Sequence, residues 1–190
     1  MKKFNKKIVS IRTYLHYYFG SFFGGINIIL NKRHGVNDKF KERIMLACTE
    51  VTGCEFCSFA HGKEALEAGL SDEEISKILG GNSSDVPENE AVGIAYAIAF
   101  SDNDGRPGKN IYEKLVNEYG KKKAKTIRTL CNMISVGNTI GISSALLKNK
   151  FKRNKTEGSF FLREIIIFLL TLVFLPVSLT LFIIGIPFNI

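Results

Sequence analysis

The stretch GCEFCSFAH, residues 53–61, holds the side chains best suited to chemistry. Two cysteines stand at positions 54 and 57, and a histidine follows four residues after the second cysteine. On a helix, Cys57 and His61 share one face, and Cys54 and Cys57 nearly share one. Backbone N–H groups at a helix start stabilise a thiolate, and a histidine within reach can take up the thiol proton. The stretch therefore supplies a nucleophilic thiolate, a second thiol that can close a disulfide, and a proton-transfer group.

Two other interpretations of these residues are open. Cys54, Cys57 and His61 could be three ligands of a structural zinc ion, with Cys48 or Glu42 as the fourth. Such sites usually bring a second close ligand pair from elsewhere, which this chain lacks. The residues could also belong to a non-catalytic, membrane-tethered helical module that serves assembly or binding.

The remaining two cysteines need no chemical role. Cys48 and Cys131 stand among apolar residues at helical spacing. A free cysteine in such a place commonly behaves as a small buried hydrophobe. We expect both thiols in the core.

The elements that position these residues are predicted to be helices. The first of them begins with Asn37 as N-cap and ends at Gly53, and the next begins at Cys54. Ser71 and Glu74 form the pattern of a capping box for the helix that follows. Strand alternation is absent, so the fold class is all-α, a bundle of about six to eight helices. Further helices are predicted at 90–100, 110–120 and 121–148.

The run ERIMLACTEVTGCEFCSFAHGKEALEAGLSDEEI, residues 42–75, resembles the alkylhydroperoxidase D-like branch of the carboxymuconolactone decarboxylase family. Redox members of that family show a glutamate, a Cys-x-x-Cys pair twelve residues later, and a histidine after three more residues. Glu42, Cys54, Cys57 and His61 keep every one of these spacings. Because Glu42 lies in an apolar segment, we also expect it to be buried with a partner.

The resemblance implies a role for each of these residues. Cys57 is the reactive thiolate, Cys54 is its resolving partner, and His61 with Glu42 forms a proton relay. The substrate is a hydroperoxide or a disulfide, and an external dithiol of the lipoyl or thioredoxin kind reopens the internal disulfide. The resemblance also implies a homo-oligomer, and a mechanism that needs no metal, flavin or haem cofactor.

The chain departs from the family pattern in two ways. Phe56 stands where the best-studied redox members carry a histidine, which removes one group that could stabilise the thiolate. The alkylhydroperoxidase D-like helical bundle is expected over residues 25–147, and a membrane anchor is not part of that pattern. The true decarboxylases do not rely on a Cys-x-x-Cys pair, so its presence argues against lactone decarboxylation.

The distribution of charge points to a membrane and away from nucleic acid. Residues 1–35 carry seven Lys or Arg and no acid, whereas residues 36–147 hold thirteen basic and sixteen acidic residues. A nucleic-acid-binding domain would carry its positive charge on the folded body. Basic flanks suit attraction to an anionic membrane surface.

The C-terminal segment is the predicted anchor. Residues 165–190 contain no charged residue and are long enough to cross a bilayer as one transmembrane helix. The basic linker before them, residues 148–164, keeps the catalytic domain on the cytoplasmic side by the positive-inside rule. Cysteines of a cytoplasmic domain are expected to be reduced or catalytic. Residues 1–24 are predicted as a basic, aromatic helical extension that packs on the domain or lies on the membrane.

Overall fold

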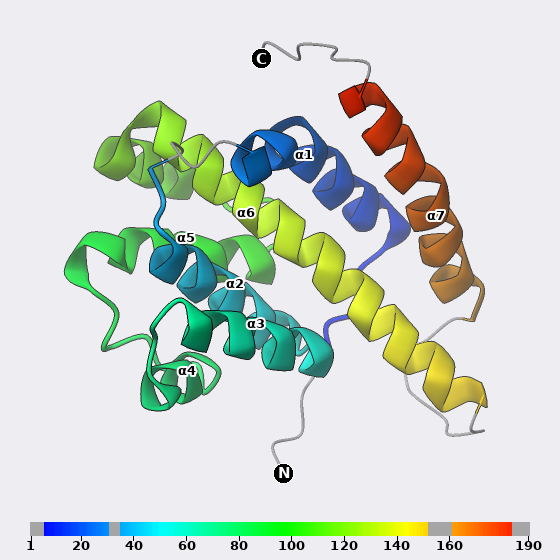
Figure 1. Ribbon diagram of the computed structural model, residues 1–190, viewed down its shortest axis with the longest axis horizontal. Coiled ribbons are helices and arrows are strands. Elements are labelled where there is room, and N and C mark those ends of the chain that lie inside the picture. Colours follow the sequence, from blue (N-terminus) through cyan, green and yellow to red (C-terminus); the bar gives the residue numbers. More distant parts are fainter. Residues whose placement is uncertain (1–5, 31–34, 152–160, 184–190) are drawn as a thin grey trace.

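The computed structural model describes residues 6–30, 35–151 and 161–183 (Figure 1). Within these ranges the chain forms seven helices and no strand, which confirms the predicted all-α class. Residues 1–5, most of the predicted basic linker and residues 184–190 of the predicted anchor lie outside the described residues. The helices are α1 (Ile11–Leu30), α2 (Asp38–Thr52), α3 (Glu55–Glu67), α4 (Asp72–Ile78), α5 (Glu88–Asp102), α6 (Lys109–Phe151) and α7 (Phe161–Ile183).

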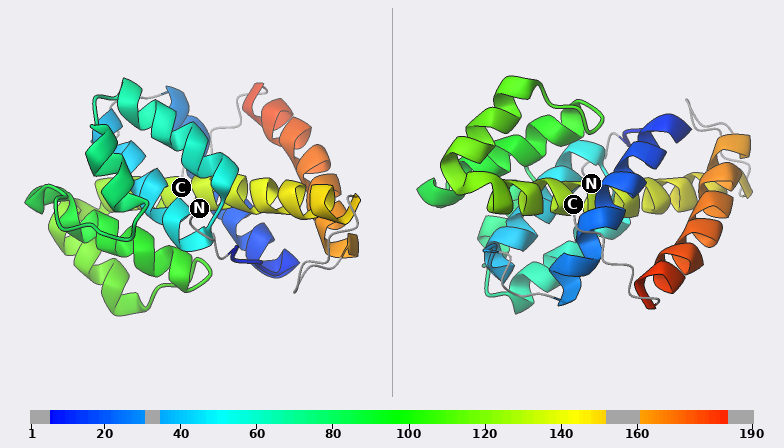
Figure 2. Two further views of the ribbon diagram at one scale, coloured as in Figure 1. Left: turned by 90° about the horizontal axis from the view of Figure 1, so that it is seen from below. Right: turned by 90° about the horizontal axis from the view of Figure 1, so that it is seen from above.

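The long helix α6 is the centre of the bundle. α1 crosses it on one side, while α2 and α3 lie on the opposite side, and α7 stands at one end against α1 and α6 (Figures 1 and 2). Helices α2, α5 and α6 also pack on one another. Aromatic and aliphatic side chains from α1, α2, α5 and α6 fill the main core. The largest of them are Tyr17, Phe40, Ile44, Leu46, Tyr96, Phe100, Leu115, Ile127 and Leu130.

Helix α6 is interrupted at Gly120. Its backbone angles there are φ 74° and ψ 161°, a conformation that side chains with a Cβ rarely adopt. The break divides α6 into a short first part and a long second part. The two parts match the helices predicted at 110–120 and 121–148.

One helix among the described residues, Lys109–Lys150, is apolar and long enough to cross a membrane on length and composition alone. Because α6 is the central helix, 56% of its most apolar stretch is buried in the bundle. This degree of burial is typical of a core helix. The predicted C-terminal anchor, residues 165–190, coincides with α7 as far as Ile183. Its membrane-spanning role stays a prediction.

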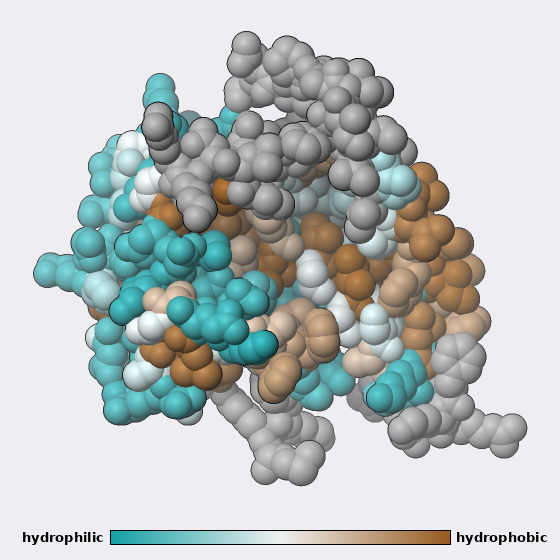
Figure 3. All heavy atoms as spheres, in the orientation of Figure 1, coloured by the Kyte–Doolittle hydropathy of each residue, from teal (hydrophilic) through white to brown (hydrophobic). Residues whose placement is uncertain are grey.

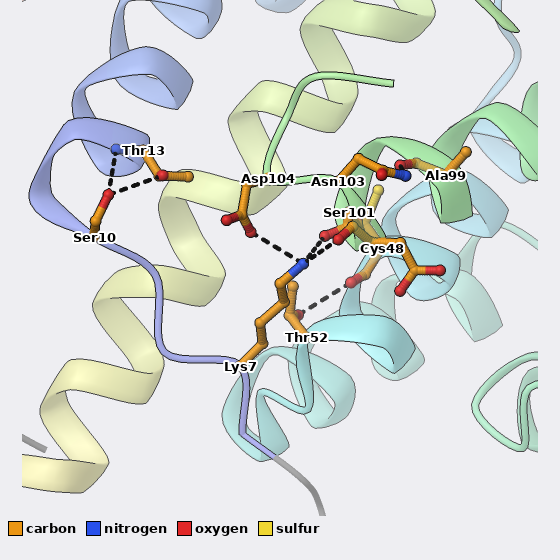
Figure 4. Close-up of polar contacts among 10 residues, drawn as sticks. Lys7, Ser10, Thr13, Cys48, Thr52, Ala99, Ser101, Asn103 and Asp104 are labelled. Carbon is orange, nitrogen blue, oxygen red and sulfur yellow. Dashed lines mark hydrogen bonds and ion pairs between the residues drawn. The ribbon is translucent and has the colours of Figure 1, made fainter. Parts of the chain in front are cut away.

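A short N-terminal segment, Lys6–Ser10, ties several helix ends together (Figure 4). Nζ of Lys7 donates to the carbonyl oxygens of Ser101 and Asp102, both at 2.6 Å, and lies 3.0 Å from Oδ1 of Asp104. These carbonyls belong to the C-terminal end of α5, where a cation is favourable. The backbone N–H of Lys7 also donates to the carbonyl of Thr52 at the end of α2. The segment thereby fixes the chain next to the start of α3.

Candidate functional site

The cysteine pair lies at the junction of α2 and α3. Gly53 ends α2 in the left-handed conformation, with φ 70°, and turns the chain so that Cys54 becomes the N-cap of α3. Sγ of Cys54 accepts a hydrogen bond from the backbone N–H of Cys57 at 3.3 Å. The two cysteines form a disulfide, with Cα atoms 5.3 Å apart, inside the usual range for such a bond. Both are nearly covered, since Cys54 is 1% exposed and Cys57 is 6% exposed.

Glu42 and His61 are in direct contact. Glu42 is 2% exposed, in agreement with the burial expected from its apolar surroundings. Its Oε2 lies 2.8 Å from Nδ1 of His61, and its Oε1 lies 3.2 Å from Nζ of Lys41. A buried carboxylate needs such partners, because an isolated charge is costly away from water. Glu42 engages Nδ1, so Nε2 is the ring nitrogen left for proton exchange.

Lys41 completes this polar group on α2. Burial by itself would lower the pKa of the Lys41 ammonium, but the hydrogen bond and negative charge of Glu42, aided by Asp38, raise its pKa overall. The lysine is therefore held in its charged form beside Glu42. Lys41 is not among the predicted site residues, and its only sign in the sequence is its position next to Glu42.

The redox pair rests directly on the backbone of α6. A Cβ atom added to Gly141 would lie 2.7 Å from Sγ of Cys54 and 3.2 Å from Sγ of Cys57. Real Cβ atoms do not approach other atoms so closely, so only glycine leaves room for both sulfurs here. Ile142 and Leu146, also on α6, pack against the same sulfurs together with Ile8. None of these contacts was predicted, and a glycine inside a helical pattern was the only signal.

A second polar contact lies one helical turn from Gly141. Asn138 is 1% exposed, and its Oδ1 accepts a hydrogen bond of 3.2 Å from Oγ1 of Thr49 on α2. The other end of the amide, Nδ2, has no hydrogen-bond partner among the described residues. The contact joins α2 to α6 near the cysteine pair.

The two remaining cysteines lie in the main core, apart from the disulfide. Cys48 on α2 and Cys131 on α6 are both free thiols and both fully buried, as expected. Burial, reinforced by the neighbouring Cys48, raises the pKa of the Cys131 thiol well above its ordinary value. No group of three or more His, Cys, Asp or Glu side chains in the described part of the chain could hold a metal ion.

The outer face of α3 is apolar beside the disulfide. Phe56, which replaces the histidine of other redox members, is 72% exposed, and Phe59 is 77% exposed. Cys57 lies between them in the sequence but points inward. A molecule that approaches the redox pair from outside α3 thus meets two aromatic rings.

The fold and site define an all-helical domain with a Cys-x-x-Cys pair at a helix start and a hydrogen-bonded Glu–His pair. Residues 17–97 match the carboxymuconolactone decarboxylase family, which confirms the resemblance, and this segment includes all four predicted site residues. This match links residues 17–97 to a family that includes decarboxylases and peroxidase-like enzymes. Searches of curated proteins and of solved structures gave no match.

Proposed function

We propose that this protein is a membrane-anchored, thiol-dependent peroxidase or disulfide oxidoreductase that uses Cys54 and Cys57. The observation that carries the proposal is the disulfide at the start of α3 together with the hydrogen bond between Glu42 of α2 and His61 of α3. His61 is one helical turn beyond Cys57, on the same face of α3. A nucleophile, a resolving thiol and an oriented imidazole are the parts that thiol redox catalysis needs.

The peroxidase reaction begins with the reduced pair. The Cys57 thiolate attacks the terminal oxygen of a hydroperoxide, the O–O bond breaks, and Cys57 becomes a sulfenic acid. The leaving alkoxide takes a proton from His61, which Glu42 holds in orientation. The Cys54 thiol then attacks the sulfenic sulfur, releases water and forms the disulfide. An external dithiol reduces this disulfide by exchange and is itself oxidised.

Thiol–disulfide exchange with a protein partner is the second candidate. It uses the same two sulfurs, but the thiolate attacks a disulfide in place of a hydroperoxide. The exposed rings of Phe56 and Phe59 favour it, because apolar side chains beside a reactive pair suit the docking of another protein.

The location and partners belong to the same proposal. The C-terminal segment anchors the protein in a membrane, with the catalytic domain on the cytoplasmic side and several copies assembled as a homo-oligomer. The helical form of α7 and its exposed apolar side chains support the anchor. Substrates are a hydroperoxide or a disulfide, and a lipoyl- or thioredoxin-like dithiol serves as the reductant.

The proposal is tested by intact-mass analysis of the full chain in detergent. The protein is reduced with a dithiol, freed of it, and treated with one equivalent of hydroperoxide. We expect loss of two hydrogens and a Cys54–Cys57 bridge in the peptide map, reversed by fresh dithiol. In Cys57→Ser the bridge cannot form. Thiols that stay inert towards both peroxides and disulfides, or stoichiometric zinc bound to the pair, would overturn the proposal.

A further inference from the structure

Helix α7 is apolar on the side turned away from the domain. In a helix on the surface of a soluble protein, the apolar face is turned inward and the polar face meets water. On α7 the inward side carries Glu164 and Ile167, which are both fully buried, and Thr171, which makes a hydrogen bond to the domain. Apolar side chains occupy the outward side, visible at the right edge in Figure 3. The most exposed of these are Phe161, Leu162, Leu169, Leu172 and Val173.

The inward side of α7 is attached to α1 by specific polar contacts. The hydroxyl groups of Tyr14 and Thr171 lie 2.7 Å apart, and the hydroxyl of Tyr18 donates to the carbonyl of Phe174 at 2.8 Å. The rings of Tyr18 and Phe174 are stacked, with centroids 4.9 Å apart. The described part of α7 is therefore docked on α1 along much of its length, unlike a helix that trails from a flexible linker.

The entry to α7 is also fixed to the domain. Nε of Arg163 donates to the carbonyl of Val9, just before α1 begins, at 2.7 Å. The same guanidinium pairs with Oε1 of Glu164 at 2.9 Å. The buried carboxylate is thus compensated, and the start of α7 is tied to the start of α1.

The exposed apolar surface continues from α7 onto α1. Phe19 of α1 is 49% exposed, and its ring lies 5.9 Å from that of Phe174 on α7. A contiguous apolar surface on two neighbouring helices normally marks a place that something else covers.

We infer that α1 and α7 form one membrane-embedded helix pair whose outward surface, Phe19 with Leu162, Leu169, Leu172 and Val173, is covered by lipid acyl chains. The inference rests on the membrane anchoring proposed above and adds α1 to the lipid-facing surface. It replaces a flexible tether by a domain that packs directly on its membrane helix.

Two features favour lipid over a second copy of the chain as the occupant. The segment from Ile165 to Ile190 has no charged residue that could fix a specific protein contact, and its length matches a bilayer. A basic group also lies where the head groups would lie: Nζ of Lys150 is 5.8 Å from the ring centre of Phe161 at the start of α7. Lysines in that position suit lipid phosphates.

The chain contains no tryptophan, so the fluorescence of a single introduced tryptophan reports on its own position. Single tryptophans are introduced by Leu172→Trp and Leu169→Trp on α7, by Phe19→Trp on α1, and by Leu66→Trp as an exposed control on α3. Each full-length variant is reconstituted in vesicles of phosphatidylcholine and phosphatidylglycerol, with or without bromine on the acyl chains. Circular dichroism checks that each variant keeps its helices. Bromine quenches tryptophan only on contact, so the fluorescence reports which side chains touch acyl chains.

We expect tryptophans at 172, 169 and 19 to emit at shorter wavelength and to lose most of their fluorescence in brominated vesicles, while the tryptophan at 66 is unchanged. Quenching at 169 and 172 without quenching at 19 would overturn the inference and leave the membrane anchor intact. If no position is quenched and the protein crosslinks through α7, the surface is an interface between copies, and both the inference and the anchor fail. None of these outcomes bears on the thiol chemistry, which the mass measurement tests separately.

Discussion

Oε2 of Glu42 lies 2.8 Å from Nδ1 of His61, and this contact joins α2 to α3, the helix that holds Cys57 and is capped by Cys54. The opposite carboxylate oxygen contacts Lys41 at 3.2 Å, so the glutamate is held from both ends. The orientation of the imidazole thereby depends on a residue nineteen positions earlier in the chain. Its proposed role in proton transfer can be tested without touching a sulfur.

Glu42→Gln should slow disulfide formation while leaving both thiols in place. The amide can still contact His61 but no longer offers a carboxylate oxygen to Nδ1, so the ring is held less firmly in its orientation. We expect the rate of peroxide-driven Cys54–Cys57 bridge formation to fall about 100-fold, the lower end of typical general acid–base contributions. Quenched samples analysed by intact mass give the rate. Glu74→Gln is the matched control, because it breaks a similar pair, to Arg43 at 2.6 Å, away from the cysteines. If the disulfide forms at the same rate in Glu42→Gln and Glu74→Gln, Glu42 has no part in the proposed proton relay.

Gly141→Ala should disturb the redox pair, whereas Gly137→Ala should not. Both glycines lie inside α6, but a Cβ at position 137 has nothing within 4 Å. Gly137→Ala should stabilise the protein by about 0.5–1 kcal/mol through helix propensity. At position 141 the added methyl group meets Cys54, so overpacking of about 1–3 kcal/mol outweighs that gain. Chemical denaturation of the oxidised proteins measures the difference. A Gly141→Ala variant as stable as Gly137→Ala would contradict the close packing described for the sulfurs.

Lys7→Met should cost more stability than Lys6→Met. Lys7 binds two carbonyls at the end of α5 as well as Asp104, and its loss should cost about 1–2 kcal/mol. Among the described residues, Lys6 makes one long ion pair of 3.6 Å with the largely exposed Glu55, worth at most about 0.5 kcal/mol. Thermal unfolding of the two variants beside the parent compares them. If both variants unfold at the same temperature as the parent protein, the contacts of Lys7 do not stabilise the fold.

The buried thiol of Cys131 should make stability fall at alkaline pH. Burial raises its pKa in the folded state, so the unfolded chain loses this proton first as the pH rises. The protonated Cys131 thiol contributes fully to the unfolding free energy below the ordinary thiol pKa of about 8.5. Above that pH this contribution falls by about 1.4 kcal/mol per pH unit. The unfolding free energy of Cys131→Ala, measured with urea between pH 7.5 and about 9.5, should therefore depend less steeply on pH than that of the parent. Parallel curves would show that Cys131 does not contribute.

The boundaries of α2 could be predicted because their causes are local. Asn37 accepts the N–H of Phe40 at 2.8 Å, and Gly53 takes the left-handed conformation, as expected from residue type alone. The capping box at the start of α4 was only half correct. Ser71 accepts the N–H of Glu74, but the Glu74 carboxylate turns to Arg43 because that buried guanidinium needs negative partners.

The surroundings of the redox pair could not be predicted to the same depth. The spacing of Cys54, Cys57 and His61 is visible in one short stretch of sequence, and the family pattern adds Glu42. Gly141, which lies against the two sulfurs, is more than eighty residues later in the sequence. Thr49 and Asn138, which are hydrogen-bonded, are separated by a similar number of residues. Such contacts depend on how α6 packs across α2 and α3, which periodicity within one helix does not determine.

The N-cap of α3 is a cysteine, and this gives the helix an unusual dependence on oxidation state. Cys54 receives the N–H of Cys57 through its sulfur, the atom that changes its bonding when the disulfide opens. In the reduced protein that N–H faces a thiol or a thiolate, and only the thiolate is a strong acceptor. Reduction also removes the covalent link between the N-cap and the first turn of α3, so we expect this turn to be less constrained in the reduced protein. Exchange of its amide hydrogens with solvent would then follow the state of the sulfurs, and Phe56 and Phe59 would shift with that turn on the surface a partner meets.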